Sequence, residues 1–251
     1  ADWLSGVFHG DWGESFFLQQ SVLDCIAQYF GPTLSLAILA QIFAVILSIP
    51  LGILAAYYRG SAVDLATVSV SLLGIAVPGF LLSMFLMLFF GVFLQLLPVA
   101  GYAPLSQGLW EHLRYLILPA LSLGLVQAAY ITRMTRSALL DVLYKNYIRT
   151  ARAKGLRESA ILFGQALKNA APTILTVVGQ SFGSLVTGTI VTETIFNIPG
   201  LGMLTMSSIN QRDVFVIQGV VLFVTVIYVL VNLAVDILYG LVDPRIQLGR
   251  Q

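Results

Sequence analysis

Five long runs of mostly apolar residues constrain this chain more than any other feature of its sequence. They cover approximately residues 33–58, 65–97, 113–131, 172–196 and 215–242. A helix needs about 20 apolar residues to cross the hydrocarbon core of a bilayer. None of the runs alternates in the way that the ~10-residue strands of an outer-membrane barrel do. We therefore expect an all-α, polytopic transmembrane helical bundle with five spans in this chain.

The composition supports a membrane protein. The 251 residues are 58% hydrophobic and 10% charged, whereas about 25% of the residues of a soluble domain are charged. The second run is long for one span and has Pro78-Gly79 near its middle, so we expect a kink or a broken helix there. The single cysteine, Cys25, cannot form an internal disulfide, and we expect a buried or inert thiol.

The basic residues fall almost entirely on one side of the predicted membrane. The connections alternate between an outer set (1–32, 98–112 and 197–214) and an inner set (59–64, 132–171 and the tail from 243). The outer set and its borders hold two of the 13 Lys and Arg residues, and the inner set holds the other eleven. Because cytoplasmic loops carry the excess of Lys and Arg, the inner set is predicted to be cytoplasmic.

This topology gives the domain organisation. We expect an external N-terminal segment (1–32), a membrane domain (33–243) with a cytoplasmic loop (132–171), and a cytoplasmic tail (244–251). The start of the chain would lie outside the cell membrane. A natural start in the cytoplasm would require a sixth span upstream of Ala1.

The loop 132–171 is the longest polar stretch and carries eight of the basic residues. Good helix formers, with Gly155 as a stop, predict two short helices with a turn between them. A basic helix of this kind could lie on anionic lipid headgroups. It could also dock a cytoplasmic partner, because the small residues Thr150, Ala151, Ala153 and Gly155 would allow close approach.

Two motifs in this loop resemble those of a known family. They are Arg149-Thr-Ala-Arg-Ala-Lys-Gly155 and Gln165-Ala-Leu-Lys-Asn-Ala170. They resemble the cytoplasmic loop of the dipeptide/oligopeptide/nickel permeases, the membrane subunits of binding-protein-dependent ABC importers. In that family the loop carries a Glu-Ala-Ala…Gly motif. Here Arg149-Thr150-Ala151 stands in its place, which is similar to the peptide-permease branch.

Further motifs resemble the same family in the same order. They are Gly10-Asp-Trp-Gly-Glu-Ser15, Glu193-Thr-Ile-Phe-Asn-Ile-Pro-Gly-Leu-Gly202, Asn232-Leu-Ala-Val-Asp236 and Asp243-Pro-Arg245. The resemblance covers essentially the whole chain. It implies the type I ABC importer permease fold in the bacterial inner membrane, and a first span upstream of Ala1.

The resemblance also implies the partners and the mechanism. Half of the substrate cavity would come from this chain and half from a second, homologous permease subunit. Two ATPase subunits would bind ATP-Mg below, and an extracytoplasmic solute-binding protein would deliver the solute by alternating access. The ATPase-coupling residues would be Arg149, Thr150, Ala151, Arg152, Ala153 and Gly155. The segment with Glu193, Pro199, Gly200 and Gly202 would lie at the external gate, on the binding-protein side.

Two acidic residues, Glu193 and Asp236, lie within predicted spans. Charged side chains in hydrocarbon are costly and usually face a bundle interior or water. Structural ion pairing or solvation at a helix end competes here with a role in a gate or substrate path. For Pro199-Gly-Leu-Gly202, a tight turn is the plain alternative to a functional mouth.

Other chemistries find little support in the sequence. No Gly-x-x-x-x-Gly-Lys-[Ser/Thr] phosphate loop occurs, so we expect no ATP binding by this chain, no catalysis and no cofactor of its own. Gly179-Gln-Ser-Phe-Gly183 matches a serine-nucleophile pattern but lies inside a span, where helix packing through small residues explains it better. His9 and His112 are expected to be ordinary polar residues and not metal ligands. The topology explains the basic loop without nucleic acid.

The main alternative is a stand-alone secondary transporter or channel. It would use intramembrane charges for ion coupling and would have no reason to carry a docking helix in the loop 132–171. The substrate stays open among a dipeptide, an oligopeptide, glutathione, an opine and a nickel complex.

Overall fold

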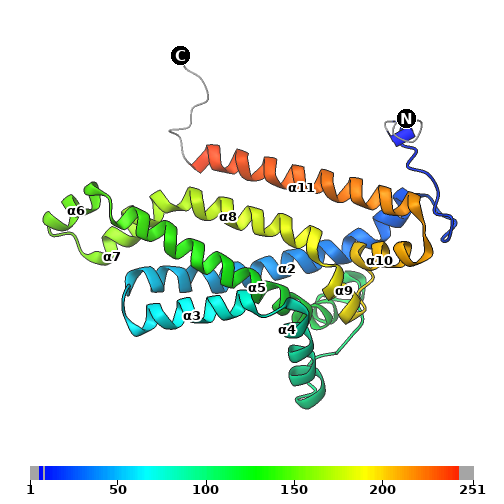
Figure 1. Ribbon diagram of the computed structural model, residues 1–251, viewed down its shortest axis with the longest axis horizontal. Helices are drawn as coiled ribbons and strands as arrows, with labels where there is room; N and C mark the ends of the chain where they lie inside the picture. Colours follow the sequence, from blue (N-terminus) through cyan, green and yellow to red (C-terminus); the bar gives the residue numbers. More distant parts are fainter. Residues whose placement is uncertain (1–5, 8, 243–251) are drawn as a thin grey trace. The chain divides into compact units, whose positions relative to one another are not determined.

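The computed structural model describes residues 6–7 and 9–242, and the elements in this part of the chain are helices joined by short connections (Figure 1). The only β-type pairing among these residues is an isolated antiparallel bridge between Glu14 and Ser21. The principal helices are α2 (Val22–Tyr57), α3 (Ala62–Ala76), α4 (Gly79–Leu86), α5 (Leu109–Leu143), α6 (Asn146–Ala153), α7 (Glu158–Ile161), α8 (Leu167–Gly188), α9 (Ile190–Phe196), α10 (Leu201–Gln211) and α11 (Val214–Val242). The all-α prediction is therefore confirmed. The predicted tail 244–251 and the motif Asp243-Pro-Arg245 lie outside the described residues.

The apolar runs form helices that are long enough to cross a membrane. Among the described residues, four unbroken stretches of helix qualify, and one bent pair of helices adds a fifth when it is counted as a single span. The helices are longer than the apolar runs: α2 has 36 residues, or about 54 Å, against a hydrocarbon core of about 30 Å. The apolar composition identifies only the part of each helix that hydrocarbon can surround. Backbone hydrogen bonding extends the helix beyond that part, into polar sequence.

The predicted break in the second run is present. α3 ends at Ala76, and α4 begins at Gly79 and continues as a π-helix over Met87–Phe93, at 99° to α3. The residue before a proline avoids the α region, and Val77 is extended, with φ −76° and ψ 123°. Pro78 therefore separates the two helices. Pro119, by contrast, lies inside α5, which continues past it.

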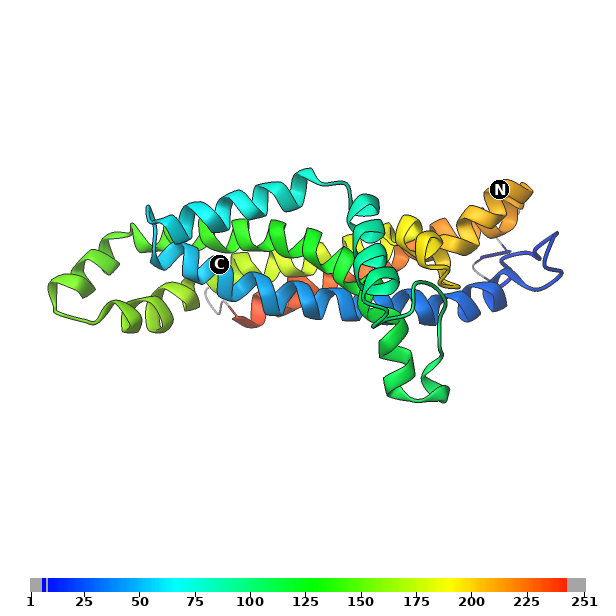
Figure 2. The ribbon, with the colours of Figure 1, turned by 90° about the horizontal axis from the view of Figure 1, so that it is seen from below.

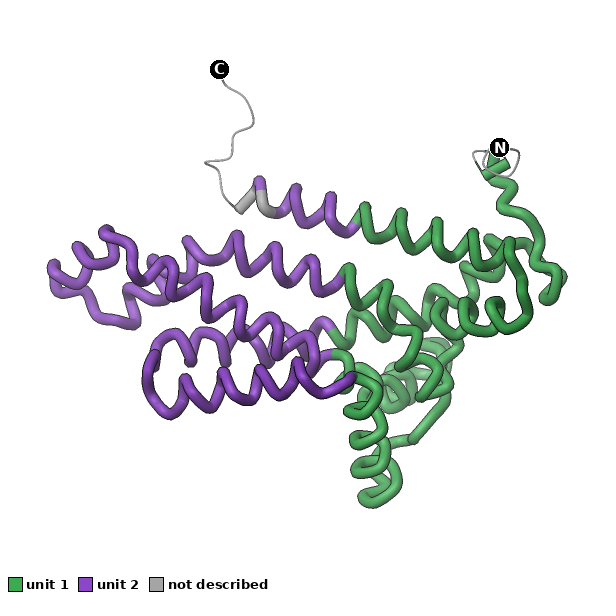
Figure 3. The backbone as a smooth tube through the Cα atoms, in the orientation of Figure 1, with its two compact units in different colours: residues 1–40, 79–123, 183–230 green, residues 41–78, 124–182, 231–251 purple. Residues whose placement is uncertain are grey.

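The chain forms two compact units (Figure 3). Unit 1 comprises residues 1–40, 79–123 and 183–230, and unit 2 comprises residues 41–78, 124–182 and 231–251. Every connection predicted to be external belongs to unit 1, and every connection predicted to be cytoplasmic belongs to unit 2. α2, α5, α8 and α11 contribute residues to both units.

Close helix contacts through small residues hold unit 2 together. α3 lies along α5 in two views at right angles (Figures 1 and 2), and a Cβ on Gly74 would come within 2.9 Å of the Ala129 side chain. A Cβ on Gly52 of α2 would come within 2.7 Å of the Thr135 side chain. Small residues let backbones approach where no hydrophobic effect drives helix association. The same unit also contains a buried apolar cluster that includes Leu139, Leu162 and Ile174.

Unit 1 has its own core, where α2, α10 and α11 meet. Its buried residues are Val22, Cys25, Ile26, Leu201, Leu204, Val216 and Val220. Phe30 and Phe223 pack edge to face against this cluster, with ring centroids 5.1 Å apart. Cys25 is a buried free cysteine, as expected.

Candidate functional site

In unit 2, the predicted coupling segment is the short helix α6, which a turn joins to α7. The prediction of a second short helix is wrong, because α7 continues through a π-helix (Leu162–Ala166) into α8. Ile148 and Ala151 of α6 are buried against Ile161 of α7, with Leu143 packed beside them. A salt bridge joins the same two helices: Arg152 donates to the two Glu158 carboxylate oxygens at 2.7 and 3.1 Å. α6 is therefore held on an apolar base while its other face stays open.

The Arg152–Glu158 pair is a surface feature. About half of each side chain is exposed, and exposed ion pairs contribute about 0–1 kcal/mol. The hydrogen bonds to Glu158 raise the pKa of the Arg152 guanidinium above its usual value. Arg152 is thus charged at every physiological pH and fixed in direction by its partner.

Gly155 forms the turn that was predicted as a helix stop. Its φ is +79°, in the left-handed region, where glycine carries no steric penalty. The space around a Cβ at Gly155 is empty within 4 Å. Backbone conformation, and not crowding, therefore requires a glycine here.

Five of the six predicted coupling residues are exposed, and they share one short segment: Arg149, Thr150, Arg152, Ala153 and Gly155. The sixth, Ala151, is buried and belongs to the base of α6. Its small size serves packing within this chain. We call Arg149, Thr150, Arg152 and Ala153 the exposed α6 face.

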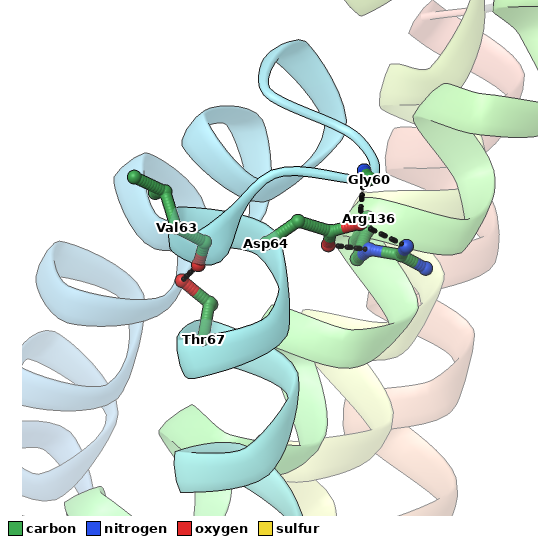
Figure 4. A network of polar contacts seen from close by, with 5 residues as sticks. All are labelled: Gly60, Val63, Asp64, Thr67 and Arg136. Atoms are coloured by element: carbon green, nitrogen blue, oxygen red, sulfur yellow. Dashed lines mark hydrogen bonds and ion pairs between the residues drawn. The ribbon is translucent and has the colours of Figure 1, made fainter.

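A second ion pair in unit 2 joins α3 to α5 (Figure 4). Arg136 donates to both oxygens of Asp64 at 2.6 and 2.8 Å, and the Gly60 backbone N–H donates to Asp64 at 2.9 Å. Asp64 is only 6% exposed. Planar, bidentate pairs of this kind are strong and directional. The sequence placed Asp64 in a connection and did not indicate its partner, 72 residues away.

In unit 1, Glu193 is fully buried and accepts four hydrogen bonds. Thr33 Oγ1 and Thr189 Oγ1 both donate to its Oε1 at 2.7 Å. The backbone N–H groups of Gly202 and Met203 donate to its Oε2 at 2.7 and 3.1 Å. These five residues form what we call the Glu193 network.

The Glu193 network caps the start of α10. Gly202 and Met203 are in the first turn of that helix, whose N–H groups have no partner within the helix. A carboxylate at this position satisfies two of them and interacts favourably with the helix dipole. Thr33 accepts from the Leu201 N–H at 2.8 Å, so α2 is tied to the same helix start.

The glycines of the predicted gate motif allow this carboxylate to approach. A Cβ on Gly200 would collide with the Glu193 carboxylate, and one on Gly202 would come within 2.5 Å of the Ile190 Cα. Pro199 is exposed beside them. The structure thus brings together Glu193, Gly200 and Gly202, and the alternatives of an ion pair or a solvated helix end are wrong for Glu193. Asp236 is exposed on α11 and takes no part in the network.

A similar capping arrangement fixes the N-terminal segment of unit 1. Ser15 Oγ donates to Asp213 Oδ2 at 2.6 Å, and both side chains are buried. The Phe17 N–H donates to the same oxygen at 3.3 Å, and the Val216 N–H donates to Asp213 Oδ1 at 3.4 Å. Asp213 therefore caps α11 and holds the segment in the motif that begins at Gly10.

Sequence reasoning missed Thr33, Thr189 and Asp213. Thr189 could have been predicted, because residues four positions apart, such as Thr189 and Glu193, lie on the same face of a helix. Thr33 was not, since it comes from another helix 160 residues away.

The serine-nucleophile pattern has a packing explanation. Ser181 Oγ donates to Gln41 Oε1 at 3.0 Å and to the Val178 carbonyl at 2.8 Å, and neither group is a general base. A Cβ on Gly179 would collide with the Val235 side chain.

Comparison with known proteins supplies the family context. The profile of the family described as "binding-protein-dependent transport system inner membrane component" matches residues 48–248. A "Probable peptide ABC transporter permease protein" of Sinorhizobium fredii is 42% identical over 98% of this chain and 78% of the relative. The dipeptide transport system permease protein of Escherichia coli K12 is 40% identical over 98% of this chain and 79% of the relative.

Two solved structures have a similar fold. One is an inward-facing methionine ABC transporter, with a TM-score of 0.72 and 18% identity over 88% of this chain and 97% of that one. The other is an amino acid ABC transporter with histidines, with a TM-score of 0.60 and 16% identity over 98% of this chain and 99% of that one. At such identities the likeness concerns the fold alone.

Proposed function

Because this chain belongs to the family of binding-protein-dependent transport system inner-membrane components, we propose that it carries peptides or related small solutes inward. It is a multi-pass membrane protein and a permease subunit of an ABC importer. The peptide assignment is supported by the two relatives named above, which are named for peptide and dipeptide transport. The alternative of a stand-alone secondary transporter has no comparable support.

The proposed assembly has separate parts for energy and for delivery. A second, homologous permease would complete the solute pathway within the membrane. Two ATPase subunits would bind ATP-Mg on the cytoplasmic side, and this chain would hold no nucleotide itself. An extracytoplasmic solute-binding protein would deliver the solute on the side of unit 1.

The exposed α6 face is the observation that carries the coupling role. α6 is anchored from below by Ile148 and Ala151 and from the side by the Arg152–Glu158 pair. Arg149, Thr150 and Ala153 remain exposed. A prefolded helix loses little conformational entropy on docking, so α6 could transmit movement of the ATPase subunits to the spans.

Transport then follows from a population shift. ATP would have to bind one arrangement of the ATPase dimer more tightly than the other, and α6 would pass this preference to the permease. The Glu193 network would give the external side a rigid corner between α9 and α10. The segment with Pro199, Gly200 and Gly202 would lie at this corner, at the external gate that faces the binding protein.

The coupling role can be tested by co-purification in mild detergent. Ala153→Arg adds bulk and charge to the exposed α6 face without touching the buried base. It is a cleaner probe than Gly155→Arg, because any L side chain at Gly155 is strained by the positive φ. We expect Ala153→Arg to lose the ATPase subunits while the chain still inserts in the membrane.

Ser106→Arg is the matched control. Ser106 is also small and exposed, but it belongs to a connection predicted to be external. It should retain the ATPase subunits as the natural chain does. Equal retention by both variants would contradict a docking role for α6.

A further inference from the structure

A small pocket lies in unit 2, where the ends of α2 and α5 meet α6 and α7. Its polar side chains come from all four of these elements and from the turn after α2: Tyr57, Arg59, Tyr144, Arg152 and Glu158. Its volume is about 190 Å³, below the roughly 300–1,000 Å³ of pockets that enclose a whole drug-sized ligand. We call it the Arg59 pocket. It has room for one end of a larger molecule.

The Arg59 pocket carries a net positive charge. Arg152 donates to both Glu158 carboxylate oxygens at 2.7 and 3.1 Å, so these two charges offset each other. Arg59 is exposed, and its guanidinium lies 4.7 Å from the centre of the Tyr144 ring. Asp64, the acidic residue nearest to Arg59 in the sequence, already accepts two hydrogen bonds from another arginine. A cation–π contact orients a guanidinium without consuming its N–H donors, so Arg59 can donate to an anion.

The floor of the pocket is apolar, which separates it from a site for a free inorganic ion. It consists of Ala56, Leu140, Leu143 and Leu162. Ala56 and Leu162 are buried in the apolar cluster of unit 2, and the other two pack against that cluster. A small hydrated anion would lose water beside such a floor and gain no contact in return. The pocket therefore suits an amphiphile that has an anionic group next to an apolar part.

An exposed apolar face of α2 leads to the pocket. Leu47, Leu51, Leu54 and Tyr57 are spaced by four, three and three residues, which places them on one side of the helix. All four side chains are exposed, and Tyr57 lines the pocket. Exposed leucines suit contact with lipid tails, and tyrosines are enriched at the level of the headgroups. A phospholipid that lies along this face has its headgroup at the Arg59 pocket.

We propose that the Arg59 pocket binds the phosphate of an anionic phospholipid in the leaflet predicted to be cytoplasmic. Arg59 donates to the phosphate, Tyr144 orients its guanidinium, and the apolar floor contacts the glycerol region of the lipid. Basic pockets between membrane helices on this side are suited to such headgroups. The inference requires that the chain lies in a membrane and does not depend on what it transports. The bound lipid connects α6 to the ends of α2 and α5.

Photolabelling of the assembled importer in nanodiscs tests this site. The probe is phosphatidylglycerol with a diazirine beside its headgroup, present as a minor component of phosphatidylcholine discs. Labelled peptides are identified by mass spectrometry. We expect labels at residues 57–59 and at Tyr144, and we expect unlabelled phosphatidylglycerol in the discs to reduce them. A higher proportion of phosphatidylcholine in its place should have no such effect.

Two outcomes with the unaltered complex would overturn the proposal. If inorganic phosphate in solution reduced the labelling as well as phosphatidylglycerol does, the ligand would be a soluble anion and not a lipid. If the pocket took no label in the complex, no lipid would reach it, as when the ATPase subunits cover it. The labelling needs no ATP, so a failure of ATP-driven uptake would contradict the importer assignment alone.

Arg59→Gln and Arg133→Gln form a matched pair of variants. Both arginines are exposed and belong to unit 2, but Arg133 does not line the pocket. Arg59→Gln should lower labelling of the pocket about fivefold at limiting probe, the factor that one basic residue near an anionic membrane contributes. Arg133→Gln should leave it unchanged. An equal loss in both variants would indicate attraction by the whole basic surface and contradict a defined site, as would full labelling of Arg59→Gln.

Discussion

Glu193 shows how a buried carboxylate can be held without a cation. Its four hydrogen bonds come from two hydroxyls and two backbone N–H groups. A carboxylate that accepts several such bonds is stabilised by the donors and by the helix dipole together. Its position explains why the motif around it contains Gly200 and Gly202.

Removal of the Glu193 carboxylate should destabilise the protein markedly. Glu193→Ala would leave buried donors without partners, at a cost of at least about 3 kcal/mol. Glu193→Gln should cost less, because its amide oxygen still accepts. The readout is the melting temperature in detergent, with Thr194→Ala as control, since Thr194 is exposed and bonds only within its helix. Equal melting of Glu193→Ala and Thr194→Ala would contradict a structural role.

The Asp64–Arg136 pair should behave as a buried ion pair. Arg136→Met leaves a nearly buried carboxylate uncompensated and should cost about 3–5 kcal/mol. The double variant Asp64→Leu/Arg136→Met should recover most of that loss. Arg114→Met is the control, because Arg114 and Glu111 form a 3.9 Å pair that is almost half exposed and worth about 0–1 kcal/mol. Thermal unfolding of the three variants and the unaltered protein checks the predicted order of stability. A double variant that melts as low as Arg136→Met would contradict the prediction.

At the scale of elements, the turn at Gly155 links sequence to function. Its positive φ ends α6 and directs the chain into α7. Gly164 provides a comparison within the same loop, since the space around its Cβ is equally open but its φ is not positive.

Gly155→Ala should therefore destabilise the loop by about 1 kcal/mol, because an L residue in the left-handed region meets its own backbone. Gly164→Ala lies in helix and should be neutral or stabilising. Amide hydrogen exchange of α6 measures the difference. Faster exchange in Gly164→Ala than in Gly155→Ala would contradict this account.

Element types were well predicted from the sequence, and the reasons are physical. Apolar runs of about 20 residues indicate spans because hydrocarbon cannot solvate an open backbone. Pro78 and Gly155 act locally, so their effects could be predicted from neighbours alone. Helix ends were predicted less well: α5 continues to Leu143, beyond the apolar run, because helix formation does not require hydrophobicity.

Contacts between distant residues could not be predicted in this way. Thr33 with Glu193 and Asp64 with Arg136 join different helices, and nothing local to either partner identifies the other. The gate motif could be identified from consecutive residues in the sequence. The burial of the Glu193 carboxylate and its hydrogen-bond partners depend on how the helices pack, so they could not be predicted. For the coupling loop, the turn at Gly155 was predicted correctly, but the second helix was wrongly predicted to be short, because it continues from Glu158 into α8. The sequence also did not separate the buried Ala151 from the exposed α6 face.

At the scale of the whole molecule, the predicted sidedness follows from charge. Unit 1 holds the connections predicted to be external, and unit 2 holds the basic ones. Ser106→Cys and Ala153→Cys, both at exposed positions, test this in a chain whose single cysteine has been removed by Cys25→Ala. An impermeant thiol reagent should label Ser106→Cys in intact cells, after the outer membrane is opened, and Ala153→Cys only after lysis. Labelling of Ala153→Cys in intact cells, and of Ser106→Cys only after lysis, would contradict the predicted topology.

Reconstitution of the purified complex into proteoliposomes tests the central claim most directly. The complex is supplied with ATP-Mg on the side of the ATPase subunits, and with the solute-binding protein and a labelled short peptide on the other side. The account predicts peptide uptake that requires both ATP and the binding protein and that is lost with Ala153→Arg. Uptake by this chain alone, driven by an ion gradient without ATP, would contradict it and establish a secondary transporter.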